Sequence, residues 1–137
     1  MKLVVDANIV FSAIIKRQFT LSILENKLLE LYAPDYLLAE LRRYETLVCN
    51  KAGFSPEELD EFIRALRKRI TFVPDNKIAP ALPCAFAISP DPKDAAYFAV
   101  AMTVQCSLWS NDKKLKEQDS IRVLNTKEVL GLLEKNK

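Results

Sequence analysis

Short apolar runs that alternate with longer helical patterns constrain the fold of this chain more than any other feature. The first run, Lys2 to Val5, ends at Asp6 and is apolar enough for a strand buried on both faces. Strands that alternate with helices predict a three-layer α/β/α domain with a central, mainly parallel sheet of about four to five strands. The 137 residues fit one domain, 1–137. The remaining strands are predicted at Leu31 to Ala33, Ile70 to Val73, Ser107 to Ser110 and Ile121 to Leu124.

The segments between these runs carry helix signals. Ser55-Pro56-Glu57-Glu58 combines a capping serine, a proline in the first turn and an acid three residues after the cap. Pro74 to Pro90 contains four prolines and is predicted to be irregular. The helices are expected at Asn8 to Lys16, from a Thr20 cap to Leu31, from an Asp35 cap to about Cys49, from Ser55 to Ile70, from Asp91 to about Val104, briefly around Lys113, and from Thr126 onward.

The residue types that are missing or rare exclude several chemistries. The chain has no histidine, so Ser-His-Asp and Cys-His nucleophile systems and imidazole-based zinc sites are excluded. The two glycines, Gly53 and Gly131, stand alone and belong to neither a G-x-G-x-x-G nor a Walker A motif. Catalysis therefore has to use carboxylates, amines, hydroxyls or a hard metal ion.

Cysteine usage and hydropathy indicate a cytoplasmic protein. Cys49, Cys84 and Cys106 are odd in number and lack C-x-x-C spacing, which argues against a disulfide framework and against a thiolate metal site. No apolar run reaches roughly 18 residues and no N-terminal signal pattern is present, so we expect a soluble, unexported chain without membrane contact. The formal net charge of +2 does not by itself indicate a polyanionic partner.

Aspartates follow two predicted strands and open one predicted helix. In open α/β sheets, sites lie beyond the carboxyl ends of the strands, where Asp6 and Asp112 stand. Asp91 and Asp94 are three residues apart, so both carboxylates lie on one side of a helix that continues into the apolar run Ala95 to Met102. Capping of a helix N-terminus is the alternative role for each aspartate.

Glu40 is the least expected acid. It lies within an apolar stripe whose other members are Leu37, Leu41, Tyr44, Val48 and, at its edge, Leu47. A carboxylate on a buried helix face costs several kcal/mol unless it is paired or bound to a cation. A structural ion pair is the alternative to a ligand role.

Carboxylates from four separate segments would repel one another if they met at the sheet edge, and cations would relieve that repulsion. In the absence of histidine and of a cysteine cluster, oxygen ligands select Mg²⁺ or Mn²⁺. Acidic pockets that hold one or two such ions activate a water and stabilise the leaving oxygen in phosphodiester hydrolysis.

The same acids belong to an ordered set of short motifs. These are Leu3-Val4-Val5-Asp6-Ala7-Asn8-Ile9-Val10-Phe11-Ser12, then Glu40, then Asp91-Pro92-Lys93-Asp94 with Ala99 and Ala101, and finally Leu108-Trp109-Ser110-Asn111-Asp112. In this order the chain resembles the PIN-domain family of metal-dependent nucleases, and most of all its small prokaryotic members, which include VapC-type toxins. The resemblance spans the whole chain and is weakest from about Gly53 to Pro83.

The resemblance implies residue roles and partners. It implies that a catalytic and metal-binding quartet falls on Asp6, Glu40, Asp94 and Asp112, with Asp91 as a further acid and with Asn8 and Ser110 beside the metal. Two residues depart from the family pattern: Ala7 stands where a threonine or serine is commoner, and Trp109 replaces a smaller aliphatic residue, which concerns local packing and not chemistry. The implied protein is a Mg²⁺- or Mn²⁺-dependent endoribonuclease that hydrolyses single-stranded RNA. A homodimer and an antitoxin whose peptide covers the site, as in a toxin–antitoxin pair, are also implied.

Basic residues supply candidates for phosphate contacts. Lys113 and Lys114 adjoin Asp112 and are predicted to bind substrate. Arg42 and Arg43 lie on the polar side of the Glu40 helix. The cluster Arg64, Arg67, Lys68 and Arg69 is interpreted as a solvated helix face near a C-terminus.

Two other functions are compatible with an α/β domain of this size. One is a non-catalytic PIN-like scaffold that binds RNA or protein, and retention of all four acids disfavours it. The other is a flavodoxin-like regulatory domain with Asp6 as phosphoacceptor. That function requires paired acids directly after the first strand, where this chain has Ala7-Asn8.

Overall fold

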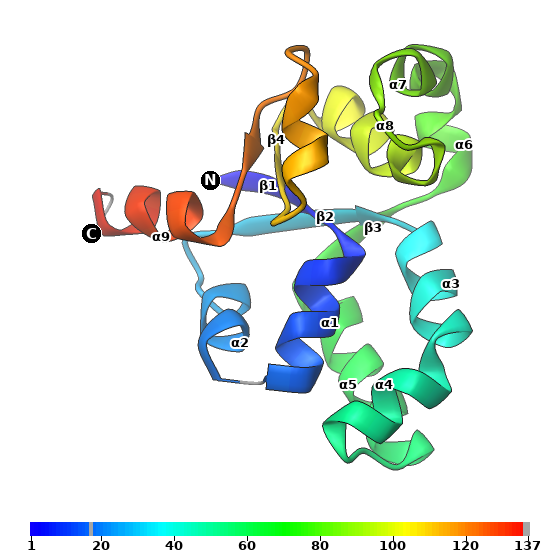
Figure 1. Ribbon diagram of the computed structural model, residues 1–137, viewed down its shortest axis with the longest axis vertical. Helices are drawn as coiled ribbons and strands as arrows, with labels where there is room; N and C mark the ends of the chain where they lie inside the picture. Colours follow the sequence, from blue (N-terminus) through cyan, green and yellow to red (C-terminus); the bar gives the residue numbers. More distant parts are fainter. Residues whose placement is uncertain (17, 136–137) are drawn as a thin grey trace.

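The computed structural model describes residues 1–16 and 18–135 and is organised around one parallel sheet (Figure 1). The five strands stand in the order β3-β2-β1-β4-β5 and all neighbours are parallel, so the predicted fold class is confirmed. β1 is central, and its Val5 is in register with Trp109 of β4. The strands are β1 (Lys2–Val5), β2 (Glu30–Pro34), β3 (Ile70–Val73), β4 (Ser107–Trp109) and β5 (Val123–Leu124).

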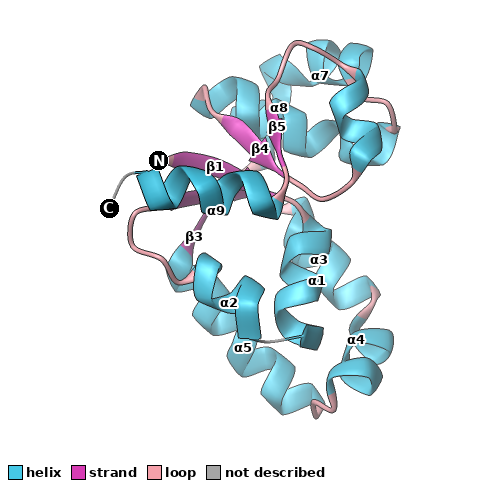
Figure 2. Cartoon of the chain, turned by 60° about the vertical axis from the view of Figure 1, so that its left-hand side comes forward, coloured by secondary structure: helices cyan, strands magenta, loops and turns pink. Residues whose placement is uncertain are grey.

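Helices cover both faces of the sheet (Figures 1 and 2). On one face, α8 (Ala95–Val104) packs against β1, β2 and β4, and α6 (Asp75–Ile78) and α7 (Leu82–Ile88) pack outside it. α9 (Thr126–Lys135) follows β5 and contacts it. The opposite face carries α1 (Ala7–Lys16), α2 (Gln18–Leu24), α3 (Tyr36–Arg43), α4 (Glu45–Ala52) and α5 (Pro56–Arg69). No helix in the described ranges is both long and apolar enough to cross a bilayer.

Local signals account for α5 and for the buried body of α8, although the helix predicted from Asp91 begins as an α-helix only at Ala95, after a 3₁₀ turn over Pro92–Asp94. In α5, the Ser55 side chain accepts a hydrogen bond from the Glu58 N–H, and the Glu58 side chain accepts one from the Ser55 N–H, so the predicted capping box is present. α8 is apolar on every side, and from Tyr97 to Ala101 its residues are buried, as its sequence predicted.

The helix predicted from Asp35 to about Cys49 is instead two helices. α3 ends at Arg43, Tyr44 takes a non-helical conformation with φ of −103° and ψ of 18°, and α4 starts at Glu45. The Tyr44 ring packs edge-on against Phe11 of α1, with ring centroids 6.0 Å apart. The break thus coincides with a contact between α1 and the end of α3, and Leu47 is 51% exposed instead of lying at the edge of a buried stripe.

The helix predicted from a Thr20 cap to Leu31 instead spans Gln18–Leu24, so Thr20 lies within it and the helix ends early. The Asn26 side chain accepts a hydrogen bond from the Leu28 N–H at 2.9 Å and forms a local turn that competes with the helix. The Arg69 guanidinium binds the backbone carbonyls of Leu24, Asn26 and Leu29 at 2.6 to 2.9 Å. A side chain more than 40 positions away therefore closes this turn.

The segment from Pro74 to Pro90 was wrongly predicted to be irregular, since it forms α6, the 3₁₀ turn η1 (Ala79–Ala81) and α7. Pro80 and Pro83 both occupy first-turn positions, where the missing N–H removes no helical hydrogen bond. Two more 3₁₀ turns, η2 (Pro92–Asp94) and η3 (Lys113–Glu117), precede α8 and follow β4.

Candidate functional site

The candidate site lies beside the central strand β1, at the point where the chain changes from one half of the sheet to the other. From β1 the chain adds β2 and β3 on one side, then crosses over to add β4 and β5 on the other. The carboxyl ends of β1 and β4 are adjacent, and the Asp6 N–H donates to the Trp109 carbonyl at 3.3 Å. Such switch points are where open α/β sheets bind ligands.

Asp6 is buried at this point, with 4% of its surface exposed. Its Oδ1 accepts a hydrogen bond from the Ile9 N–H at 3.0 Å, so it caps α1. Burial raises the pKa of Asp6 to about 6, and the charges of Asp112 and Glu40 add to that rise. Hydrogen bonds from Ser110 and Ile9 oppose it.

Asp94 occupies the cap position of α8 but makes no side-chain cap hydrogen bond. Burial raises its pKa to about 6, and so do four neighbouring carboxylates, in the order Asp91, Asp6, Asp112 and Glu40. Asp94 therefore experiences the charge of every other acid that the sequence singled out.

Glu40 projects from α3 and is half-buried. The Tyr97 hydroxyl donates to Glu40 Oε1 at 2.6 Å. Burial raises the pKa of Glu40, while the tyrosine hydrogen bond and the charges of Arg43 and Lys93 lower it. The direct partner of Glu40 is therefore a neutral hydroxyl, and not the cation that a structural ion pair would require. Arg43 and Lys93 act on Glu40 only through their charge.

Asp112 and Asp91 both make the capping contacts that were the alternative interpretation. Asp112 Oδ1 accepts from the Lys114 N–H, and Asp91 Oδ1 accepts from the Lys93 N–H, each at 3.0 Å. A cap uses one oxygen of each carboxylate, so capping and an electrostatic role in the cluster are compatible.

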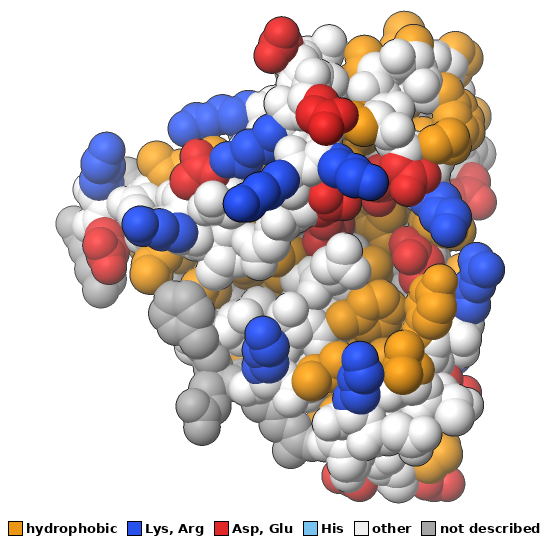
Figure 3. Space-filling model, in the orientation of Figure 1, with side chains coloured by type: hydrophobic (Ala, Val, Ile, Leu, Met, Phe, Trp, Pro, Cys, Tyr) orange, Lys and Arg blue, Asp and Glu red, His pale blue; other side chains and the backbone are white. Residues whose placement is uncertain are grey.

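The acidic cluster is defined here as Asp6, Glu40, Asp91, Asp94 and Asp112. Figure 3 shows acidic side chains gathered around a recess at the middle of one face, bordered by basic and apolar side chains. Within residues 1–16 and 18–135, no three Asp, Glu or Cys side chains are positioned to hold a metal ion. The acids interact through space, and their ligand role stays a prediction.

The two polar residues expected beside the metal differ in environment. Ser110 is 1% exposed, donates to Asp6 and accepts from the Asp112 N–H at 3.1 Å, so it links two members of the cluster. Asn8 is exposed on the first turn of α1. With Glu40 it lines a groove of about 350 Å³ that continues over Phe11, Ile15, Tyr44, Leu47, Val48 and Lys51.

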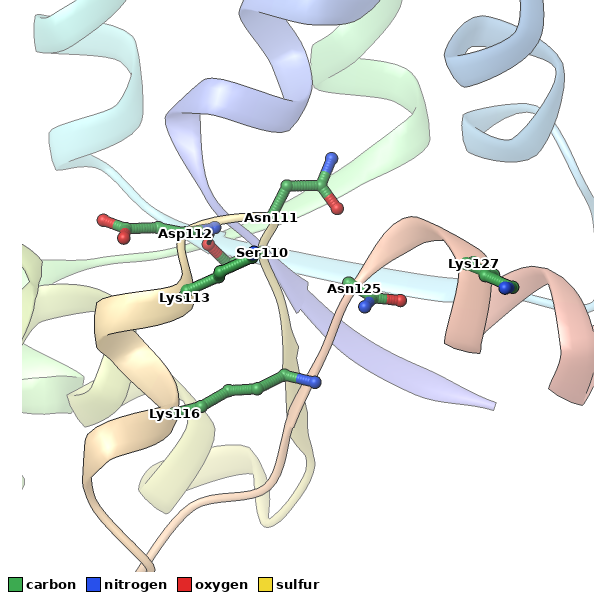
Figure 4. A pocket seen from close by; sticks show the side chains of 7 residues that line it. All are labelled: Ser110, Asn111, Asp112, Lys113, Lys116, Asn125 and Lys127. Atoms are coloured by element: carbon green, nitrogen blue, oxygen red, sulfur yellow. Dashed lines mark hydrogen bonds between the residues drawn. The ribbon is translucent and has the colours of Figure 1, made fainter.

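The basic residues fall into distinct groups. Arg42 pairs with Asp60 at 2.6 Å and with Glu45 at 3.1 Å, so it ties α3 to α4 and α5. Arg69 is structural rather than a member of a solvated face, because it binds the loop before β2. Lys113 lines a pocket of about 570 Å³ beside Asp112, whereas Lys114 does not line it (Figure 4).

Sequence reasoning missed Tyr97 as a contributor to the site. Tyr97 was assigned to an apolar helix, yet it carries the one hydroxyl between Ala95 and Met102. A buried tyrosine hydroxyl usually requires a polar partner. That rule could have identified Tyr97 as a contact for a buried acid, although not which acid.

The fold and the site define an open parallel α/β domain with coupled carboxylates at its switch point. A sequence profile of the PIN domain matches residues 4–130, and the chain belongs to the PIN-domain family. The structure is similar to the crystal structure of VapBC2 from Rickettsia felis bound to a DNA fragment from their promoter. That match has a TM-score of 0.64 at 17% identity, over 91% of this chain and 98% of that chain. No curated protein sequence matches the chain.

Proposed function

We propose that this chain is a Mg²⁺- or Mn²⁺-dependent endoribonuclease that hydrolyses single-stranded RNA, with Asp6, Glu40, Asp94 and Asp112 as catalytic metal ligands. The observation that carries the proposal is the burial of Asp6 at the switch point between β1 and β4, where Ser110 links it to Asp112 and where the charges of Glu40 and Asp112 act on both Asp6 and Asp94. Burial and neighbouring carboxylates make the ionised cluster unfavourable on its own, and a divalent cation would offset that cost.

The donor set suits such an ion. Its atoms are carboxylate oxygens, the ligands that Mg²⁺ and Mn²⁺ prefer, and Asp91 would add a fifth carboxylate. A bound divalent ion would supply Lewis acidity toward a phosphodiester and lower the pKa of a coordinated water. In this proposal Ser110 orients Asp6, Asn8 contacts the site from α1, and Lys113 and Lys114 hold substrate phosphate.

We also propose an antitoxin protein as partner, in the manner of a toxin–antitoxin pair. The groove beside Glu40 supports this, because it is mainly apolar, partly exposed and shares Glu40 with the acidic cluster. A peptide seated there would contact a predicted metal ligand directly. The similarity to VapBC2 adds support at the level of the fold. A homodimer and a cytoplasmic location stay predictions.

Cleavage of an unstructured RNA in Mn²⁺, by protein purified identically for each variant, tests the activity. We expect wild-type cleavage to disappear in EDTA and in Asp6→Asn and Asp94→Asn, because each substitution preserves shape and removes an anionic ligand. Asp119→Asn is the matched control, because Asp119 is exposed and outside the acidic cluster. Cleavage that persists in both cluster variants would contradict the assignment.

A non-catalytic PIN scaffold that binds RNA or protein is the second candidate. One observation favours it: among the described residues no three acidic or thiol side chains are positioned to hold an ion. Under this alternative, wild-type protein binds RNA but leaves it intact in both Mg²⁺ and Mn²⁺.

A further inference from the structure

A pocket of about 570 Å³ lies on the α9 side of Asp112 (Figure 4). Its walls come from the turn after β4, from η3 and from the start of α9. Three of its lining residues are lysines and one is an aspartate, so positive charge dominates. We call it the lysine pocket; it is lined by Ser110, Asn111, Asp112, Lys113, Lys116, Asn125 and Lys127.

The walls of the lysine pocket are fixed to the core. The Thr126 N–H donates to Asn111 Oδ1 at 2.8 Å, which ties the start of α9 to the turn after β4. The indole N–H of the fully buried Trp109 donates to Thr126 Oγ1 at 3.0 Å. Asn125 and Glu128 exchange backbone-to-side-chain hydrogen bonds at 2.8 and 3.1 Å, which caps α9. Hydrogen bonds to the core and between the wall segments therefore hold the pocket in a defined shape.

The lysines differ in whether a carboxylate neutralises them. Lys116 pairs with Glu128, which stands just outside the lining. Lys113 and Lys127 form no ion pair with any carboxylate of the described chain. Two uncompensated cations in a preformed pocket favour an anionic ligand.

The pocket and the acidic cluster share residues. Asp112 and Ser110 line the pocket, and the same two residues interact with Asp6. In Figure 4 the Asp112 side chain points to the side of the turn away from Lys116 and Lys127. An extended polyanion could thus have one phosphate at the acidic cluster and a flanking phosphate in the pocket.

We propose that the lysine pocket binds a backbone phosphate of single-stranded RNA that flanks the phosphate at the acidic cluster, with Lys127, Lys113 and Lys116 as the binding residues. This inference rests on the proposed function for its substrate. No aromatic side chain lines the pocket, so it lacks a platform for stacking a base. The contact would accordingly be to the backbone and independent of sequence.

Binding of a fluorescein-labelled, unstructured RNA oligonucleotide to the full chain in EDTA tests the proposal by fluorescence anisotropy. We expect Lys127→Ala and Lys113→Ala each to weaken binding about fivefold at low salt, and to reduce the salt slope by about 0.7, as for one lost phosphate contact on a single strand. Lys77→Ala is the control, because Lys77 is exposed on α6 outside the pocket.

Glu128→Gln should change the affinity for RNA in the opposite direction to the lysine substitutions. A glutamine oxygen can still accept the Asn125 N–H, while loss of the negative charge frees Lys116, so RNA binding should tighten. Thermal melts confirm folding of each variant. The proposal is overturned if Lys127→Ala binds like Lys77→Ala, if Glu128→Gln does not tighten binding, or if wild type binds no RNA at low salt.

The EDTA measurement separates this proposal from the nuclease proposal. Lysine-dependent binding without cleavage in Mn²⁺ would retain the pocket and reject the nuclease. Cleavage in Mn²⁺, together with RNA binding that neither lysine substitution affects, would support the nuclease and reject the lysine pocket as a binding site.

Discussion

The Tyr97 hydroxyl donates a hydrogen bond to Glu40 Oε1 at 2.6 Å, across 57 positions of sequence. Tyr97 belongs to α8 on one face of the sheet, and Glu40 belongs to α3. Burial and the Glu40 charge raise the pKa of Tyr97, so the phenol stays protonated and remains a donor. Tyr36 packs edge-on against the Tyr97 ring at 6.4 Å and helps to hold it. Tyr97 is therefore a positioning residue for Glu40.

Tyr97→Phe should lower the free energy of unfolding by about 1–2 kcal/mol, because a half-buried carboxylate loses its donor while the ring packing remains. The variant should also bind Mn²⁺ more weakly. Urea unfolding and Mn²⁺ titration measure the two effects. Tyr32→Phe is a matched control, because its hydroxyl contacts Glu30 at 3.4 Å at an exposed position and its loss should cost little. Equal losses in both variants would contradict the assignment.

Stability of the metal-free protein should depend on pH through Asp6 and Asp94. Their folded-state pKa values of about 6 lie above the ordinary 3.8, so the folded state binds more protons than the unfolded state between these values. The contribution of both groups to the free energy of unfolding is therefore largest below pH 4 and falls as pH rises to about 6.

Asp6→Asn tests this contribution directly. Because Asn does not ionise, the variant should lack the Asp6 part of the pH dependence and should gain up to about 3 kcal/mol at pH 7 relative to wild type. Urea unfolding in EDTA from pH 4 to 8 measures the difference. A wild type and variant with parallel pH profiles would show that the carboxyl of Asp6 is not destabilising when ionised.

Mn²⁺ should raise the melting temperature of wild type, and more at pH 7 than at pH 5, because ligand carboxylates must lose protons to bind it. At a hundredfold excess over Kd the stabilisation is about 2.7 kcal/mol. The melting temperature of Asp94→Asn should change little when Mn²⁺ is added. Thermal melts with and without Mn²⁺ give the comparison, and equal shifts in the two proteins would place the ion elsewhere.

Arg69→Ala should lower the free energy of unfolding by about 2–3 kcal/mol, because it leaves three backbone carbonyls, at the end of α2 and in the following loop, without their charged donor. Arg69→Lys should recover only part of this loss, since an ammonium lacks the planar fork of a guanidinium. Arg64→Ala, at an exposed position of α5, should change stability by less than about 0.5 kcal/mol. Urea unfolding of the three variants decides whether Arg69 is structural.

Local patterns were sufficient to predict the sheet and its acidic edge. Each strand is a short apolar run, and in a parallel sheet the residues after neighbouring strands meet at the same edge. Asp6 and Asp112 were thus predicted at the carboxyl edge of the sheet, whereas the place of Ser110 beside them was implied by the family resemblance. The capping box of α5 and the buried face of α8 were predictable for the same reason, because both depend on residues a few positions apart.

Two of the errors coincide with contacts made by elements that are distant in sequence. The break at Tyr44 coincides with its ring contact with Phe11 of α1, and the early end of α2 coincides with binding of the Leu24 carbonyl by Arg69 from α5. Both partners lie more than 30 positions from the segment that they modify. The apolar spacing of a helix continues through both points, so it did not reveal where the helices end; the Asn26 turn and the contacts with Phe11 and Arg69 lie at those ends.

The sequence by itself determined the fold class, the parallel sheet and the residues at its carboxyl edge, because strand and helix periodicity and the caps are local properties of the chain. Only the tertiary structure decided that Tyr97 is the partner of Glu40, that Arg69 closes a loop, and that Lys127 and Asp112 line the same pocket. Those contacts join elements that are distant in sequence. Their geometry depends on how the helices pack on the sheet, which no local pattern encodes.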